Sequence, residues 1–315
     1  MLPFCSCSGN SGSTTSEVAD TVATAETEEA IETVEAGTQV YSFKDSCQHL
    51  VVKLSLELPT AAGEVSTNIR QALIADFMLN ARQPGYDQEN EFSIKPYTGN
   101  TANPQAIVDY YGKADYDHLL KYAKSDYNDR IQYLNEESGL SEEEKERIRN
   151  DVPMWTFELN LKKSVDAADF VIYYSQSYVY YGGAHGGVAG SGDLTFHKKS
   201  GKKIDKFLKP NATKALQPLF RKGLLQYYRS NGEIMTDSEL SDRLQLSSDI
   251  IPQPTLTPCP NAEGDSLVFT YRQYEIACYA DGMPSFAIAA KDLMPYLTEE
   301  AKEILKQHSI KTLRK

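Results

Sequence analysis

Two stretches of the chain place an apolar residue at every second position, from 52 to 58 and again from 155 to 161. A period of two is typical of a β-strand with one buried face and one polar face. The stretch 170–181 is rich in β-branched and aromatic residues and predicts a longer strand. Shorter runs of the same kind predict strands at 193–197, 267–271 and 286–288.

Between these strands the apolar spacing changes to that of a helix. Apolar residues four positions apart give residues 66–82 one buried face. Pro104 is a favourable first residue for a second helix, and Gly112 and Gly139 are expected to interrupt or close it. Capping residues and apolar spacing predict further helices after Ser141, at 212–229, after Thr236 and after Thr298.

The order of these elements indicates the fold class. A strand, a group of helices and then several consecutive strands do not make the repeating βαβ pattern of a parallel sheet. We therefore expect an α+β fold with mainly antiparallel sheets, packed helices and two consecutive α+β subdomains. The first subdomain is expected at 41–192 and the second at 193–315.

The first 40 residues differ from the rest in composition and are expected to form a leader and a disordered acidic tether. Residues 1–43 contain seven acids and no Lys or Arg. The stretch 8–15 is rich in Ser, Gly and Thr, as flexible linkers are. Residues 17–36 lack the bulky apolar side chains that would dock a helix onto a core. The ordered body is therefore expected to begin between Gly37 and Phe43.

Cys5 and Cys7 stand immediately before this polar tether. A Cys followed by small and polar residues resembles the start of a mature bacterial lipoprotein, in which the thiol carries lipid. Cys7, which follows Ser6, is the better candidate for the lipid anchor, and Cys5 is the second. Only four residues precede Cys5, fewer than a secretory signal needs, so we expect Met1 to lie inside a longer signal peptide. The alternative is a cytoplasmic start with two accidental cysteines.

The formal net charge is −12, and the seven acids of the leader account for more than half of it. A mildly acidic body without a cluster of Lys and Arg argues against nucleic acid as a ligand. The acidic charge is compatible with a basic protein partner. No apolar run reaches the roughly 18 residues that span a bilayer. Attachment to a membrane is therefore expected only through lipid on the leader.

The five histidines do not fall into a recognisable catalytic or metal-binding motif. His185 lies near Asp193 and His197 in the sequence, but the spacing is not that of a typical metal site. The chain has no nucleophile elbow, phosphate-binding loop or dinucleotide-binding motif. We therefore expect no enzyme activity, no cofactor and no metal. The alternative is an uncharacterised hydrolase that uses His185 and nearby acidic residues.

Three further cysteines, Cys47, Cys259 and Cys278, cannot all pair with one another. Cys259 and Cys278 flank an expected hairpin. Either a disulfide between them or two free thiols fits the sequence.

Three segments of the chain together carry a family resemblance. They are Tyr180-Tyr181-Gly182-Gly183-Ala184-His185-Gly186; Gly192-Asp193-Leu194-Thr195-Phe196 with the following stretch 200–208; and Tyr274-Glu275-Ile276-Ala277-Cys278-Tyr279-Ala280-Asp281-Gly282. Over about residues 41–295, their order and spacing resemble the paired domains of unknown function of the anti-sigma factor RsiV and of the non-catalytic region of the peptidoglycan deacetylase PdaC. The chain departs from that pattern at Cys278, where the family usually has Pro, and in a longer turn at 258–264.

The resemblance implies a bacterial cell-envelope protein, facing the periplasm or the surface, that binds a ligand and is not a catalyst. In the anti-sigma branch this module senses lysozyme-like proteins. A protein of that kind, or a peptidoglycan-related ligand, is therefore the implied partner. Neither the transmembrane segment of the anti-sigma branch nor a deacetylase domain is found in the sequence, and the oligomeric state is left open.

The expected binding residues come from two of these segments. They are Tyr180, Tyr181, Gly182, Gly183, Ala184, His185, Tyr274 and Tyr279. Glycine allows close approach of a backbone, and tyrosine combines an apolar ring with a hydroxyl that suits contact surfaces. The competing interpretation is a tight turn or β-bulge at 180–187, with 274–282 forming a strand and turn packed beside it.

Overall fold

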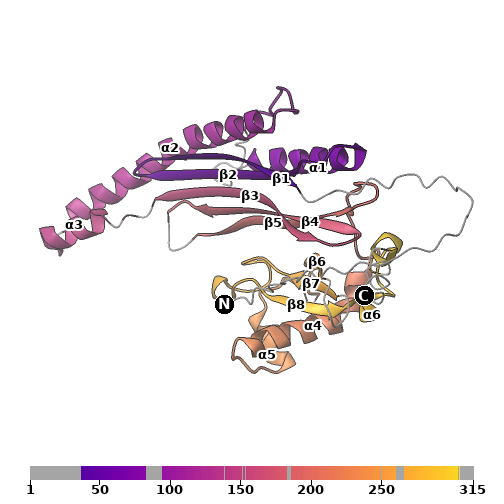
Figure 1. Cartoon of the computed structure of the whole chain (residues 1–315). Helices are drawn as coiled ribbons and strands as arrows, with labels where there is room; N and C mark the ends of the chain where they lie inside the picture. The colour runs from indigo at the N-terminus through magenta and orange to yellow at the C-terminus, as the bar shows by residue number, and fades with distance from the viewer. Residues whose placement is uncertain are drawn as a thin grey trace, which may run out of the picture. The chain divides into compact units, whose positions relative to one another are not determined.

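The computed structural model describes residues 37–82, 94–137, 139–150, 152, 154–182, 186–248, 250–259, 266–303 and 305. Within these residues, eight strands form two sheets, and helices pack on each sheet (Figure 1). Five of the six strand pairings are antiparallel. The predicted α+β fold with mainly antiparallel sheets is therefore confirmed.

The first sheet has five strands, whose order across the sheet follows their order in the chain. They are β1 (Thr38–Ser46), β2 (Leu50–Pro59), β3 (Trp155–Asp166), β4 (Phe170–Tyr180) and β5 (Gly187–His197). β2 and β3 are the parallel pair, with Leu50 opposite Trp155. A parallel pair needs a long crossover connection. Three helices lie in this connection: α1 (Glu64–Ala81), α2 (Pro104–Glu136) and α3 (Glu142–Asn150).

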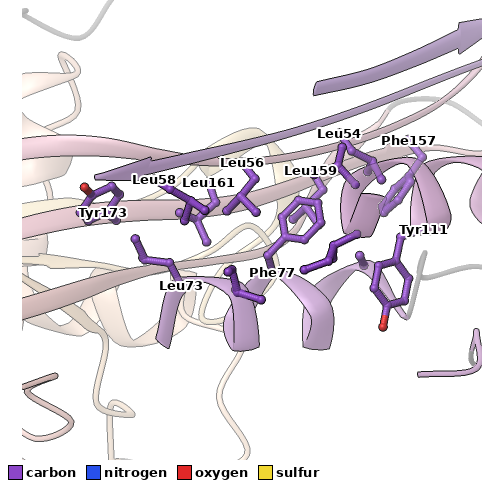
Figure 2. Close-up of a cluster of buried hydrophobic side chains, with 14 of the residues drawn as sticks. Leu54, Leu56, Leu58, Leu73, Phe77, Tyr111, Phe157, Leu159, Leu161 and Tyr173 are labelled. Carbon is purple, nitrogen blue, oxygen red and sulfur yellow. The ribbon is translucent and has the colours of Figure 1, made fainter. Parts of the chain in front are cut away.

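The main core lies between this sheet and helices α1 and α2, which run along one face of it (Figure 1). Leu54 of β2 and Phe157 of β3 point towards the side chains of Phe77 in α1 and Tyr111 in α2 (Figure 2). All four side chains are almost completely buried. Burying a large apolar side chain contributes about 1.5–3 kcal/mol, so the alternating apolar positions of β2 and β3 explain why the helices cover this face.

The opposite face of the first sheet is apolar at the start of β4, where Phe170 and Ile172 pack with Ile204, and polar towards the end of β4. Lys53 of β2 and Glu158 of β3 form an ion pair there, with 2.7 Å between Nζ and Oε1. Glu158 lies directly across from Tyr178 of β4, and side chains of directly opposed residues share one face. Tyr180, two residues along, lies on the same face. The polar face of the sheet therefore carries two tyrosines at the end of β4.

The second sheet has three strands, β6 (Thr255–Cys259), β7 (Ser266–Thr270) and β8 (Ser285–Ala289). Helix α4 (Ala212–Ser230) packs on β8, and its Phe220 meets Phe269 and Phe286 in a second core. Gly223 faces Phe286, and a Cβ at this position would overlap the ring. Further helical elements are α5 (Asp237–Arg243), the 3₁₀ turn η1 (Tyr279–Asp281) and α6 (Ala290–Leu293), and residues 299–303 are also helical.

Most of the expected helices are confirmed, but the expected role of Gly112 is wrong. Pro104 is the first residue of α2, as predicted. The helix then continues through Gly112 to Glu136. A Cβ at Gly112 would overlap the ring of Phe43 in β1. The glycine therefore permits close packing of α2 on the edge strand and does not end the helix.

Other predictions have mixed outcomes. The predicted capping box is present at the start of α5, where Thr236 and Glu239 bond each other reciprocally. The sequence patterns do not predict β1 or β6. Among the described residues no disulfide joins Cys259 to Cys278, and Cys47 is not in a disulfide either. None of the described helices combines the length and apolar composition that crossing a bilayer needs. The boundaries expected at 40 and 192 stay predictions.

Candidate binding surface

The predicted binding residues at the end of β4 lie on opposite faces of the first sheet. Tyr180 is on the polar face, together with Tyr178, which we had not predicted as a binding residue. Tyr181 turns to the helix-covered side, where its ring lies 5.2 Å from that of Trp155. Burial raises the pKa of the Tyr181 hydroxyl, which stays neutral. Tyr181 therefore packs against the core. On the other face, at the end of the strand, Tyr178 is exposed and Tyr180 is half-buried.

Gly182, which follows Tyr181, lies next to Asp126 and Arg130 of helix α2. Its φ of +81° belongs to the left-handed region, where glycine carries no steric penalty. A Cβ at Gly182 would also lie only 2.8 Å from the guanidinium of Arg130. Arg130 pairs with Asp126, which also accepts a hydrogen bond from the indole Nε1 of Trp155 at 3.0 Å. Glycine is required here for packing, independently of any ligand.

Gly186 directly precedes β5. At this residue the segment 274–282 contacts the segment 180–186. The hydroxyl of Tyr279 donates a hydrogen bond to the carbonyl oxygen of Gly186 at 2.7 Å. A Cβ at Gly186 would overlap the hydroxyl of Tyr178. Gly187 pairs with Val179, so Gly186 lies beside the end of β4. The hydroxyls of Tyr178 and Tyr279 therefore both lie beside Gly186.

Tyr274 extends this group of rings outwards. Its side chain is 61% exposed, and its ring centroid lies 5.7 Å from that of Tyr279. Its backbone has a φ of +65°, which is unusual for a bulky residue. We name Tyr178, Tyr180, Tyr274 and Tyr279 the tyrosine surface.

A partly buried ion pair holds the segment that carries Tyr274 and Tyr279. The carboxylate of Asp281 is fully buried and accepts hydrogen bonds from the guanidinium of Arg243 in α5, with 2.9 Å from Nε to Oδ1. Although burial favours the neutral acid, hydrogen bonds from Arg243 and Cys278 lower the pKa of Asp281. The Tyr227 hydroxyl donates to the carbonyl of Asp281 at 2.7 Å. These bonds hold the segment 274–282, and with it Tyr274 and Tyr279 of the tyrosine surface, in place.

The segment 274–282 consists of turns and the 3₁₀ turn η1. The strand expected within it is absent from these described residues. The packing of the segment beside the β4 loop, which the competing interpretation also required, is present. The segments 180–186 and 274–282 are therefore neighbours, whether they bind a ligand or only pack together.

Several predicted residues cannot be placed. Gly183, Ala184 and His185 lie outside the described residues, as do the candidate lipid anchors Cys5 and Cys7. The described residues contain no group of three or more His, Cys, Asp or Glu side chains able to hold a metal ion.

Asp193, in the second segment of the family resemblance, has a structural partner. Its carboxylate accepts a hydrogen bond from the Thr257 hydroxyl. This bond links β5 to β6. Burial raises the pKa of Asp193 to about 7. The Nδ1 atom of His197 accepts a hydrogen bond from the backbone of Lys199 at 3.1 Å. Each side chain is therefore engaged in local structure.

The arrangement is suited to binding. Tyrosine rings offer large apolar area with few rotatable bonds, and their hydroxyls add hydrogen bonds. Aromatic residues are enriched in the centres of protein–protein interfaces. Tyr178 could have been added to the sequence prediction, because alternation along a strand places it on the same face as Tyr180.

Comparison with known proteins supports the fold and leaves the activity open. Residues 205–291 match the family model described as "Protein of unknown function (DUF3298)", and no curated protein matches the chain. A DUF3298 family protein from Pseudomonas aeruginosa PAO1 has 14% identity and a TM-score of 0.50, over 84% of this chain and 95% of that one. A DUF3298 family member from Bacteroides fragilis NCTC 9343 has 16% identity and a TM-score of 0.54, over 85% and 96%.

At these identities the likeness concerns the fold alone. The narrower resemblance to RsiV and PdaC stays a prediction. The chain has the fold of two DUF3298 proteins of known structure, and its residues 205–291 match the DUF3298 family model.

Proposed function

We propose that this protein is a binding or sensing module of the bacterial cell envelope, and that the tyrosine surface contacts its ligand. The proposed ligand is a lysozyme-like protein or a peptidoglycan-related molecule. Lipid on Cys7, or on Cys5, would hold the protein at the membrane. The sequence of the leader supports this anchor, and the tyrosine surface supports the binding role.

The observation that carries the proposal is the conformation of Tyr274. A left-handed backbone costs roughly 1–2 kcal/mol for a residue with a side chain. Glycine or asparagine would adopt it at lower cost. The ring is also 61% exposed, so its burial in the folded chain recovers little of this energy. A bulky aromatic residue at such a position is best explained by a contact made outside the folded chain.

The test is direct binding of the full chain to a lysozyme and, separately, to purified peptidoglycan. The variant Tyr274→Asn removes the ring and keeps a residue that tolerates the left-handed backbone. We expect it to weaken binding about fivefold or more, which corresponds to about 1 kcal/mol. The melting temperature should stay the same or rise, because Asn relieves the backbone strain.

Leu79→Asn is the control, because Leu79 is a large apolar residue that is 62% exposed on α1 and lines neither proposed site. It should bind like the wild-type protein. Unaltered binding by Tyr274→Asn would contradict the proposed role of the tyrosine surface. Failure of the wild-type protein to bind both ligands would contradict the ligand class.

A further inference from the structure

A groove lies between the C-terminal part of α2 and helix α3. It has a volume of about 700 Å³, within the range of typical ligand pockets. Its apolar lining comes from Ile131 and Leu134 of α2, Leu140 of the connecting turn, Ile148 of α3 and Val152. The two helices thus form a hairpin with an apolar inner side.

This hairpin is separate from the main core. The buried side chains that α2 contributes to the first core end at Ala123. Beyond that point Leu134 is buried, whereas Tyr133 and Ile148 are 70% and 39% exposed. Large exposed apolar side chains around one groove are typical of interaction sites.

Charge around the groove is mainly negative. Residues 126–150 contain eight acids and four basic residues. Asp129 and Glu137 line the groove itself. The basic residue in the lining, Arg130, is paired with Asp126 at 2.9 Å. A ligand that enters the groove therefore meets apolar side chains at the centre and carboxylates at the rim.

We propose that the groove between α2 and α3 binds a basic amphipathic helix of a partner protein. Leucine-type residues on one face of such a helix would fill the apolar lining, as in other helix-in-groove complexes. Lysine or arginine residues on its flanks would lie beside Asp129 and Glu137. A second copy of this chain is disfavoured, because a symmetric contact would bring the same carboxylates together. An anionic membrane surface is disfavoured for the same electrostatic reason.

The test uses a fluorescent 18-residue peptide built from Leu and Lys. Its Leu residues are spaced to lie on one face of a helix, which has a period of about 3.6 residues. Fluorescence anisotropy measures its binding to the full chain. The wild-type protein should bind it saturably. Ile148→Asp, which places a charge in the lining, should weaken binding at least tenfold. Tyr133→Ser provides a second, milder variant at an exposed position, and circular dichroism checks that both variants keep their helices.

Charge is tested by a matched pair of double variants. Asp129→Lys with Glu137→Lys reverses the two carboxylates of the groove. Asp242→Lys with Asp292→Lys makes the same change of net charge at exposed positions on α5 and α6. The first pair should weaken binding at least tenfold and the second by much less. Equal weakening by both pairs would show general attraction to an acidic protein and would overturn the proposal.

Two further results would also overturn it. One is equally strong binding of a peptide with the same composition in scrambled order, or of a Leu and Glu peptide. The other is dimerisation of the chain in sedimentation velocity that Ile148→Asp abolishes, since that would identify a second copy as the occupant. Tyr274→Asn should leave peptide binding unchanged, so the outcome is independent of the tyrosine surface.

Discussion

Asp115 is buried within α2 without any group to stabilise its charge. The side chain is completely buried, and neither carboxyl oxygen has a hydrogen-bond partner among the described residues. Burial raises the pKa of this carboxyl well above its usual 3.8. The folded protein therefore keeps this proton up to a higher pH than the unfolded chain does.

The sign of the effect on stability follows from this difference. A raised pKa in the folded state means that stability is highest below about pH 3.8 and falls as the pH rises towards the folded pKa. One proton corresponds to a slope of at most about 1.4 kcal/mol per pH unit. From pH 3.8 to pH 7 the loss therefore has an upper limit of about 4 kcal/mol. Asp115→Asn keeps the shape of the side chain and removes this loss.

The assay is urea unfolding of the wild-type protein and of Asp115→Asn between pH 4.5 and 7.5. The free energy of unfolding of the variant should exceed that of the wild-type protein at pH 7, and the difference should shrink as the pH falls. Asp117→Asn is the control, because Asp117 is exposed on the same helix. A variant that is less stable than the wild-type protein by a constant amount at every pH would refute the reasoning.

Three further predictions concern the second core and its neighbours. Gly223→Ala should lower the free energy of unfolding by about 1–3 kcal/mol, despite the better helix propensity of alanine, because the new methyl group overlaps the ring of Phe286; an equally stable variant would contradict this packing. Arg243→Gln should lower the free energy of unfolding by about 1–3 kcal/mol, less than the loss of a fully buried pair, because Arg243 is 39% exposed. It should also speed amide hydrogen exchange around Asp281. Unchanged exchange would show that this ion pair does not hold the segment that carries Tyr274 and Tyr279. The carboxyl carbon of Asp193 should titrate in NMR with a midpoint near 7, and a midpoint near 4 would show that burial does not govern its pKa.

Strands that have one apolar and one polar face are well predicted by the sequence. β2 and β3 alternate regularly because one side of each lies against the helices. β1 lacks this signal because it is an edge strand whose residues are all partly or fully exposed. The parallel pairing of β2 with β3 is also invisible in the sequence, because alternation is the same in parallel and antiparallel strands.

Prediction of the candidate site was limited by contacts between distant residues. Alternation along β4 could have separated Tyr180 from Tyr181, because successive side chains point to opposite faces. The bond between Arg243 and Asp281 joins residues 38 positions apart, and no local pattern reveals it. The helical spacing of Ile131 and Leu134 is visible in the sequence. It does not show that the groove beside them is left open.

The most direct test of the tyrosine surface is a hydrogen-exchange footprint of the full chain with saturating lysozyme or peptidoglycan fragments. The account predicts slower exchange at the end of β4 and in residues 273–282, which lie next to each other through the bond between Tyr279 and Gly186. Saturable binding with protection confined to other parts of the chain would contradict it.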